Sequence, residues 1–526
     1  MTSALARALA RLEQLADRRL GAVVLFVLAV AVYAVRAIGW PLVGGRDLDE
    51  YLYDYIQFLD WHPLLPWSML FRTPVPGVVD GASLDVAGGF FAEPLMAVLF
   101  AGSVVAWCVA ARAFGARAAL LTAIALLVYP AYGLMFHEVS SEPIFAAGFA
   151  LWALLVVRAA RRPSPSRFAS VGLAVALLAL IRPGNAVLIV FALLPLLLAG
   201  SLRDRLARSG AFLLAALVPL LAWAVLNGVR FGDYALARGG NAVIPFYRAY
   251  ITDKIVSPAN GPASRRLADA VRRYLVTRNP YKAYGVTVDK VFRSGSFRIH
   301  EDFYLLSDHV FGWDTNYTVL RKAGIEAVRK HPGAYSSGVL ETVWQQLSKT
   351  YFRSLPAKQG PGPIRAAVVD VKGRELPAPT EGQPIPAGQS VWISRPDNCI
   401  RDVWTSATAH HFTFCKTRYR KRFAQIRREL NSLFAALPDR NANAWLALKM
   451  NQASRWYPRL ILWIAIGLIA LVWRRPRGAG TLVAIALAAF TVIVLNALGL
   501  FADPRFALPV APAFVLFGSC ALLGRR

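Results

Sequence analysis

Long apolar runs recur along the chain, and they constrain its fold more than any other feature of the sequence. Most have about 17–22 residues, the length that an α-helix needs to cross a hydrocarbon core of roughly 30 Å. Helices are expected because the bilayer interior offers the backbone no hydrogen-bond partners. Ten runs are found, at residues 20–38, 91–111, 116–135, 143–159, 168–181, 184–200, 210–229, 457–473, 479–499 and 506–523. The sequence therefore predicts a mostly α-helical integral membrane protein with about ten spans.

The composition excludes an ordinary soluble chain. Apolar residues make up 56% of the 526 residues and charged residues only 17%, whereas soluble domains are near a quarter charged. The chain is also basic, with 59 Lys and Arg against 31 Asp and Glu. Four cysteines are too few for a disulfide-dense secreted scaffold or a multi-zinc array.

Charge bias predicts which side of the membrane each loop faces. Arginines gather at the N-terminus, in the loops after the second, fourth, sixth and eighth runs, and at the C-terminal Arg525-Arg526. Basic loops stay on the cytoplasmic side, so both termini are expected on the cytoplasmic side of the plasma membrane. The outer side then receives residues 39–90 and 230–456. The chain is therefore expected to have three parts. These are an N-terminal membrane module (1–229, seven spans), an external domain (230–456) and a C-terminal membrane module (457–526, three spans).

The long insertion 230–456 carries the patterns of a mixed α/β domain. Amphipathic helices are predicted at about 263–276, 316–330, 335–351 and 419–436, with apolar positions three and four apart. Short strands are predicted between residues 355 and 395. The excess of basic residues suits anionic lipids, phosphate-bearing donors or an acidic wall polymer. A solvated surface beside an anionic membrane explains it equally well, and nucleic acid is not expected on this side.

Two cysteines of the insertion, Cys399 and Cys415, are expected to form a disulfide in an oxidising compartment. In the chain-entropy model, closing a loop of this size contributes roughly 3 kcal/mol. Two free thiols are one alternative. A zinc site with His410 and His411 between the cysteines is another, although zinc usually takes more ligands than this segment clearly offers.

The first external loop contains the densest group of acids. Leu48, Leu52, Tyr55 and Leu59 recur at a helical period, which predicts an amphipathic helix on the membrane surface. Asp47 and Glu50 have the spacing of a capping box, in which both acids would serve the helix N-terminus. That alternative leaves Arg46 and Asp49 unexplained, so Asp47 is also a candidate catalytic acid or base.

A second polar segment, His137-Glu138 to Glu142, links the third and fourth runs. It does not match the HExxH zinc motif, because Ser141 stands where the second His is required. Glu142 is either a helix N-terminal acid that interacts with the helix dipole or a functional acid at a span end.

Two arginines lie where the positive-inside bias predicts none, at Arg182 before Pro183 and at Arg505 after Asp503-Pro504. Each is either a snorkelling anchor or a planar guanidinium that binds a phosphate. The sequence contains no P-loop, no GxGxxG after a strand, no GxSxG and no Cys-rich metal motif. It shows no charge series inside the spans, which counts against an ion pathway.

Together these features resemble the GT-C superfamily of membrane glycosyltransferases, which includes protein mannosyltransferases, aminoarabinose transferases and arabinofuranosyltransferases that use lipid-linked sugars. The resemblance rests on the acidic first loop Gly45-Arg46-Asp47 to Tyr51, on Glu138 and Glu142 before the fourth run, and on Arg505-Phe506-Ala507-Leu508-Pro509 at the last run. It covers roughly residues 20–230 and 457–526, and no known module resembles the insertion.

The resemblance implies an inverting transfer from a polyprenyl-phosphate sugar to an acceptor glycan, lipid or protein outside the cytoplasm. By this resemblance Asp47 is the general base, with Asp49 as the alternative, and Arg182, Arg505, Arg46 and His137 contact the phosphate. Glu50, Glu138 and Glu142 would bind acceptor or sugar. A divalent cation on Asp49, Glu138 or Glu142 is allowed but not demanded by any spacing. The competing functions are a lipid or polysaccharide transporter and a non-catalytic envelope scaffold.

Overall fold

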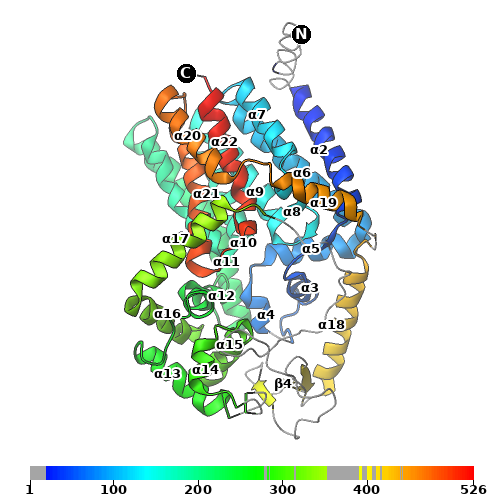
Figure 1. The fold of residues 1–526 in the computed structure, drawn as a ribbon, viewed down its shortest axis with the longest axis vertical. Helices are drawn as coiled ribbons and strands as arrows, with labels where there is room; N and C mark the ends of the chain where they lie inside the picture. The colour runs from blue at the N-terminus through cyan, green and yellow to red at the C-terminus, as the bar shows by residue number, and fades with distance from the viewer. Residues whose placement is uncertain are drawn as a thin grey trace.

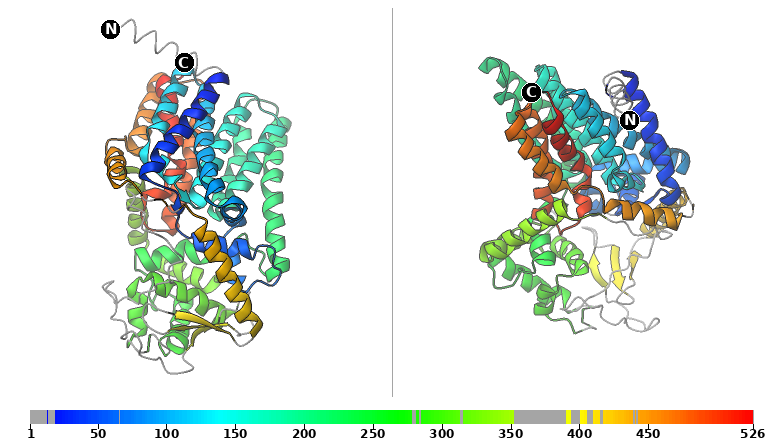
Figure 2. Two further views of the ribbon diagram at one scale, coloured as in Figure 1. Left: turned by 90° about the vertical axis from the view of Figure 1, so that its right-hand side faces the viewer. Right: turned by 45° about the horizontal axis from the view of Figure 1, so that its top comes forward.

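The computed structural model describes residue 13 and residues 19–64, 66–277, 281–282, 285–312, 315–351, 390–393, 400–404, 410–414, 417–438, 440 and 442–525. In this part of the chain, apolar helices form a bundle, and a second group of helices with a small sheet lies at one end of it (Figure 1). The first long helix begins, and the last helix ends, at the opposite end of the bundle (Figure 2).

Among the described residues, six helices are long and apolar enough to cross a membrane, which confirms a polytopic, mostly α-helical membrane protein. Five are α2 (Arg19–Gly39), α6 (Gly89–Arg112), α9 (Ser141–Arg161), α11 (Leu202–Phe231) and α21 (Ala479–Gly499), and the sixth, Pro504–Leu523, ends in α22 (Ala511–Leu523). The other four predicted runs are shorter apolar helices, namely α7 (Ala116–Leu127), α10 (Pro165–Ile181), the 3₁₀ helix η1 (Pro183–Leu197) and α20 (Leu460–Arg474). Ten crossings therefore stay a prediction.

The third predicted span, 116–135, is not one continuous helix. Helix α7 ends at Leu127, and a short helix, α8 (Pro130–Met135), begins after a break. The break lies at Tyr129, which is extended (φ −74°, ψ 102°) because a proline ring disfavours the helical conformation of the residue before it. Arg36 of α2 donates to the carbonyls of Leu127 (2.6 Å) and Tyr129 (3.4 Å). Carbonyls that lack an intrahelical partner at the end of α7 thus receive hydrogen bonds from a neighbouring helix.

Small residues let the membrane helices approach closely, as is usual where lipid provides no hydrophobic drive between helices. Helix α10 packs along α11, and α20 packs along α22. A Cβ atom at Gly172 would lie 2.1 Å from the Phe212 carbonyl oxygen, and one at Gly467 would lie 2.2 Å from the Phe517 ring. Glycine at these two positions therefore sets the spacing of both helix pairs.

The remaining elements cover one end of the bundle. Three short helices follow α2, and helices are present at all four predicted positions of segment 230–456, together with one predicted strand. These elements are α3 (Leu48–Ile56), α4 (Pro66–Phe71), α5 (Pro74–Ala87), α12 (Gly239–Ala242), the π-helix η2 (Val243–Thr252), α13 (Pro262–Ala270), the π-helix η3 (Val271–Leu275), α14 (Val288–Ser294), α15 (Phe297–Phe311), α16 (Thr318–Lys330), α17 (Pro332–Ser348), the antiparallel strands β3 (Ser390–Ile393), β4 (Ile400–Trp404) and β5 (His410–Phe414), α18 (Thr417–Ala435) and α19 (Ala444–Ser454). Helices η2 to α16 enclose a hydrophobic core of their own.

One buried arginine, Arg248, links the helices of segment 230–456 to the membrane bundle. The guanidinium of Arg248 on η2 forms two 3.0 Å contacts with Asp253 and donates to Thr342 Oγ1 of α17. It also donates to the carbonyls of Ala497 (2.8 Å) and Leu500 (3.1 Å) at the end of α21. Because helix ends leave carbonyls without intrahelical partners, this contact fixes the segment that follows α21.

The predicted disulfide between Cys399 and Cys415 falls outside the described residues, as does the alternative zinc site there. The two cysteines within the described spans, Cys108 and Cys520, are buried free thiols.

Candidate active site

A pair of two-residue strands joins the first loop to the polar segment before α9. Strand β1 (Val43–Gly44) pairs in parallel with β2 (Glu138–Val139), and the Gly45 N–H donates to the Val139 carbonyl at 3.0 Å. A Cβ atom at Gly45 would lie 2.6 Å from Ser140 Cβ, so only glycine allows this approach. Two segments about ninety residues apart in sequence are thereby placed side by side.

Asp47 follows this junction and faces an arginine rather than the helix that it precedes. It occupies the N-cap position of α3 in the left-handed conformation (φ 65°), and its side chain makes no capping hydrogen bond. Its Oδ2 instead lies 3.2 Å from Nη1 of Arg72, and Glu50 Oε2 accepts from Nε (2.8 Å) and Nη2 (2.6 Å) of the same arginine. The capping-box alternative is therefore wrong, because both acids are engaged by one guanidinium.

Arg72 is the site residue that the sequence analysis missed. It lies between α4 and α5, with a side chain 20% exposed, and Nη1 also lies 3.4 Å from the Tyr51 hydroxyl. Desolvation opposes its charge, but Glu50 and Asp47 raise the pKa of Arg72 well above its ordinary value. The only sequence signal is a lone arginine in an otherwise apolar stretch of a predicted external loop.

The two candidate bases, Asp47 and Asp49, differ in their surroundings. Asp47 is partly exposed between Arg72 and Arg46, whereas Asp49 is exposed on α3. Desolvation raises the pKa of Glu50, which Arg72 counteracts and Asp47 reinforces. Only Asp47 of the two candidates shares a cation with another acid of the loop.

Arg182 and Glu142 form a second ion pair, across the ends of α10 and α9. Arg182 Nη2 lies 2.8 Å from Glu142 Oε1, and its Nε and Nη2 donate to Ser141 Oγ at 3.2 and 2.9 Å. The Arg182 side chain is 20% exposed and that of Glu142 is 10% exposed. Arg182 is thus held by two hydrogen-bonding partners in the first turn of α9, and it does not extend away from the protein as a snorkelling anchor would.

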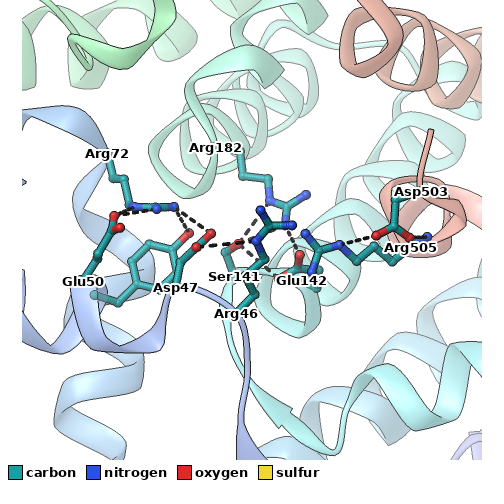
Figure 3. A network of polar contacts seen from close by, with 10 residues as sticks. Arg46, Asp47, Glu50, Arg72, Ser141, Glu142, Arg182, Asp503 and Arg505 are labelled. Atoms are coloured by element: carbon teal, nitrogen blue, oxygen red, sulfur yellow. Dashed lines mark hydrogen bonds and ion pairs between the residues drawn. The ribbon is translucent and has the colours of Figure 1, made fainter. Parts of the chain in front are cut away.

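Two further arginines converge on the same place. Arg505 Nε lies 3.0 Å from Asp503 Oδ2, and its charge interacts with those of Glu142 and Asp47. Arg46 contacts Asp47 at 3.7 Å and lies over the Phe501 ring. Figure 3 shows the guanidinium groups of Arg46, Arg182 and Arg505 ending in one region, with Asp47 and Arg72 beside it. Four arginines from separate segments therefore line one polar site.

Two other predicted residues have different positions. His137 is fully buried and stacks on the Tyr33 ring at 4.1 Å, and Glu138 is half-buried on β2. Within the described ranges, no group of three or more His, Cys, Asp or Glu residues is placed to hold a metal ion. These residues thus support the junction under the arginines, and no ligand set for a divalent cation is found in that part of the chain.

A further acid lies close by, on the buried face of α5. Asp80 is completely buried, and neither of its carboxyl oxygens has a hydrogen-bond partner among the described residues. Burial raises the pKa of Asp80 well above its ordinary range, and the negative charge of Glu142 adds to this. Asp80 is therefore a buried acid without a cation partner among the described residues, and the sequence analysis did not single it out.

Comparison with known families finds a match for one portion of the membrane part. Residues 87–226 match the family described as dolichyl-phosphate-mannose-protein mannosyltransferase, a family of the GT-C superfamily. Residues 87–226 are thus similar to the GT-C membrane glycosyltransferases. The resemblance expected from the sequence is confirmed, and with it a glycosyltransferase type of enzyme. The matched segment contains Glu142 and Arg182, whereas Asp47, Arg72 and Arg505 lie outside it.

Two solved structures are similar to the chain over most of its length. They are crystal structures of ArnT from Cupriavidus metallidurans, one bound to undecaprenyl phosphate and one in the apo state. Identity is 15% in both cases. The first comparison covers 96% of this chain and 78% of the other with a TM-score of 0.35, and the second covers 95% and 77% with a TM-score of 0.32. No curated protein matches the sequence.

Proposed function

We propose that this GT-C-type protein transfers a sugar from a polyprenyl-phosphate donor to a glycan, lipid or protein acceptor outside the cytoplasm. The observation that carries the proposal is the placement of an accessible carboxylate, Asp47, beside a cluster of arginines from four segments. A base next to a phosphate-binding group is what a single displacement on a phosphate-linked sugar requires. The description of the matching family also names a sugar carried on dolichyl phosphate, a polyprenyl phosphate.

In this proposal Asp47 is the general base. It accepts the proton of an acceptor hydroxyl while the acceptor oxygen bonds to the anomeric carbon from the side opposite the phosphate. The bond between the anomeric carbon and the phosphate oxygen breaks, and the lipid phosphate leaves with its electron pair, so the configuration inverts. The Asp47 side chain is 36% exposed, which lets an acceptor reach it. Asp49 remains the alternative base, but it has no part in the Arg72 contacts.

Cationic groups would stabilise the charge that builds on the leaving phosphate. Arg182 at the end of α10, Arg505 at the start of the last span and Arg46 in the first loop supply this positive charge. Their planar guanidinium groups can bind phosphate oxygens in pairs. Among the described residues, each forms an ion pair with a single carboxylate, so N–H groups are left to donate to a phosphate. Arg72 orients Asp47 and Glu50.

The four remaining candidates, Glu50, His137, Glu138 and Glu142, have supporting roles in this scheme. Glu142 holds Arg182 in place, and Glu50 competes with Asp47 for Arg72. Glu138 and the buried His137 shape the junction beneath the arginines. We also retain the sidedness predicted from charge, with both termini in the cytoplasm and segment 230–456 outside the plasma membrane as a separate domain.

The test is transfer by Asp47→Asn, with Asp49→Asn, two residues away, as the matched control. Membranes that contain the protein supply donor and acceptor, and the polyprenyl phosphate released is quantified by mass spectrometry. Loss of a general base predicts a fall of roughly a hundredfold to ten-thousandfold in Asp47→Asn, and near-normal release in Asp49→Asn. Neither variant removes a helix cap, because the Asp47 side chain makes no capping hydrogen bond and Asp49 lies inside α3.

Two outcomes would contradict the proposal. If Asp49→Asn loses transfer and Asp47→Asn does not, the base is two positions away. If neither variant changes polyprenyl phosphate release in correctly inserted protein, the first loop holds no base, and a transporter or a scaffold becomes the better explanation.

A further inference from the structure

The end of the bundle opposite the polar site holds an arginine-lined cleft. It lies where α9 ends and α10 begins, has a volume of about 640 Å³, and is lined by Leu155, Arg158, Arg161, Arg162, Arg167 and Ser170. Helix α9 starts at Ser141 in the polar site and has 21 residues, which corresponds to roughly 30 Å at 1.5 Å per residue. The cleft and the polar site are thus separated by about one membrane thickness.

The four arginines of the cleft are positive charges without acidic neighbours. Arg158, Arg161 and Arg162 are exposed, and no ion pair joins any of the four to a carboxylate among the residues that the structure describes. Arg167 has a structural contact, because its Nη1 donates to the carbonyls of Arg162 (2.9 Å) and Arg158 (3.4 Å). Three guanidinium groups therefore remain available to a ligand, beside one that braces the turn.

The surroundings indicate which anion the cleft would take. Leu155 adds an apolar wall one turn inside α9, so the cleft opens at the level where a spanning helix meets the headgroups. Basic pockets between membrane helices bind phospholipid headgroups, and guanidinium groups bind phosphate oxygens in pairs. The volume is in the range of small-molecule sites, about 300–1,000 Å³. Several unpaired cations are matched better by two phosphates than by one.

We infer that the cleft between the end of α9 and the start of α10 binds an anionic phospholipid whose headgroup carries two phosphodiesters, as in cardiolipin. The inference is independent of the proposed transfer reaction, because the ligand belongs to the leaflet away from the polar site. Helices α9 and α10 carry Glu142 and Arg182 at their other ends. A lipid bound across the turn therefore braces the two helices that hold this ion pair.

Native mass spectrometry of the purified full chain tests the inference, with cardiolipin, phosphatidylglycerol and phosphatidylethanolamine added separately. The variant pair is Arg158→Gln with Arg162→Gln, which leaves the structural Arg167 in place. A matched control is Arg203→Gln with Arg477→Gln, because both arginines are exposed at the same end of the bundle, Arg203 in the first turn of α11 and Arg477 between α20 and α21. Both pairs remove two charges and should unfold at the wild-type temperature in zwitterionic detergent.

Wild type is expected to retain cardiolipin most strongly, then phosphatidylglycerol, with phosphatidylethanolamine weakest. The cleft pair should bind cardiolipin about 30-fold more weakly, since each basic residue near the surface contributes about fivefold, and the control pair should bind it normally. Equal losses in the two pairs would show a general charge effect and overturn the site. Equal binding of cardiolipin and phosphatidylglycerol would overturn the two-phosphate headgroup. Displacement of cardiolipin by an equal concentration of inorganic pyrophosphate would overturn a lipid as the ligand.

Discussion

The ion pair between Arg182 and Glu142 allows phosphate binding to be separated from structural support. If Arg182 binds the donor phosphate, Arg182→Gln removes a charge-assisted hydrogen bond, which contributes about 1.5–3 kcal/mol. Undecaprenyl phosphate should then bind roughly tenfold to a hundredfold more weakly. Glu142→Gln should bind it at least as well as wild type, because the guanidinium remains and a carboxylate that competes with the phosphate is removed.

The same pair predicts the cost to stability. Removing one partner of a fully buried ion pair costs about 3–5 kcal/mol. Arg182 is 20% exposed, and the charge of Arg505 also acts on Glu142. We therefore expect a smaller loss of about 1–3 kcal/mol in the free energy of unfolding of Arg182→Gln. The double variant Arg182→Gln/Glu142→Gln should recover most of this stability but none of the lipid binding.

Binding is measured by titrating undecaprenyl phosphate into detergent-purified protein, and stability by thermal unfolding of the same samples. Arg230→Gln is the control, because Arg230 lies at the same end of the bundle on α11 and its guanidinium donates to the Asp60 carbonyl. It should lose stability without losing lipid affinity. The reasoning is refuted if the double variant binds the lipid like wild type, since Arg182 would then serve only to neutralise Glu142.

Four further predictions concern other parts of the structure. Arg72→Gln should lower the rate of transfer at least tenfold with little change in the donor KM, because the shared cation of two acids is lost; Arg72→Lys should recover only part, and an unchanged rate would exclude an orienting role. Gly45→Ala should cost about 1–3 kcal/mol in unfolding free energy through overpacking at the strand pair, and wild-type thermal stability would contradict the close approach. Arg248→Met should lower the free energy of unfolding by about 3–5 kcal/mol, because the variant leaves a buried carboxylate and two helix-end carbonyls without their donor. A wild-type unfolding temperature in this variant would contradict the structural role of Arg248. Thiol titration of denatured, unreduced protein should find two thiols if Cys399 and Cys415 are paired, and four would disprove the disulfide.

Patterns that are local in sequence were sufficient for much of the fold. The length of the apolar runs predicted the membrane helices, and the helical period predicted α3, α16, α17 and α18 within a few residues. The break at Tyr129 was also within reach, because Pro130 disfavours a helix at the residue before it, but a run of apolar residues on both sides concealed it. These features depend on residues that are close together in the sequence, so they can be predicted from the sequence directly.

Some residues of the candidate site could also be predicted from the sequence, and others could not. Asp47, Arg182 and Arg505 could be selected from the sequence because a charge at the end of an apolar run is costly and therefore informative. Arg72 could not be selected, since nothing near it in the sequence shows that α4 and α5 fold back to place it against the first loop. The capping spacing of Asp47 and Glu50 was misleading for the same reason.

By itself, the amino-acid sequence determined that this protein is a helical membrane protein and which charged residues border its spans. Only the tertiary structure decided which of those charges meet. Apolar length and periodicity act between residues a few positions apart, whereas an ion pair such as Arg182 with Glu142 joins residues forty positions apart through the packing of α9 on α10. Because that packing depends on close contacts along whole helices, the partner of a charge is a property of the assembled bundle.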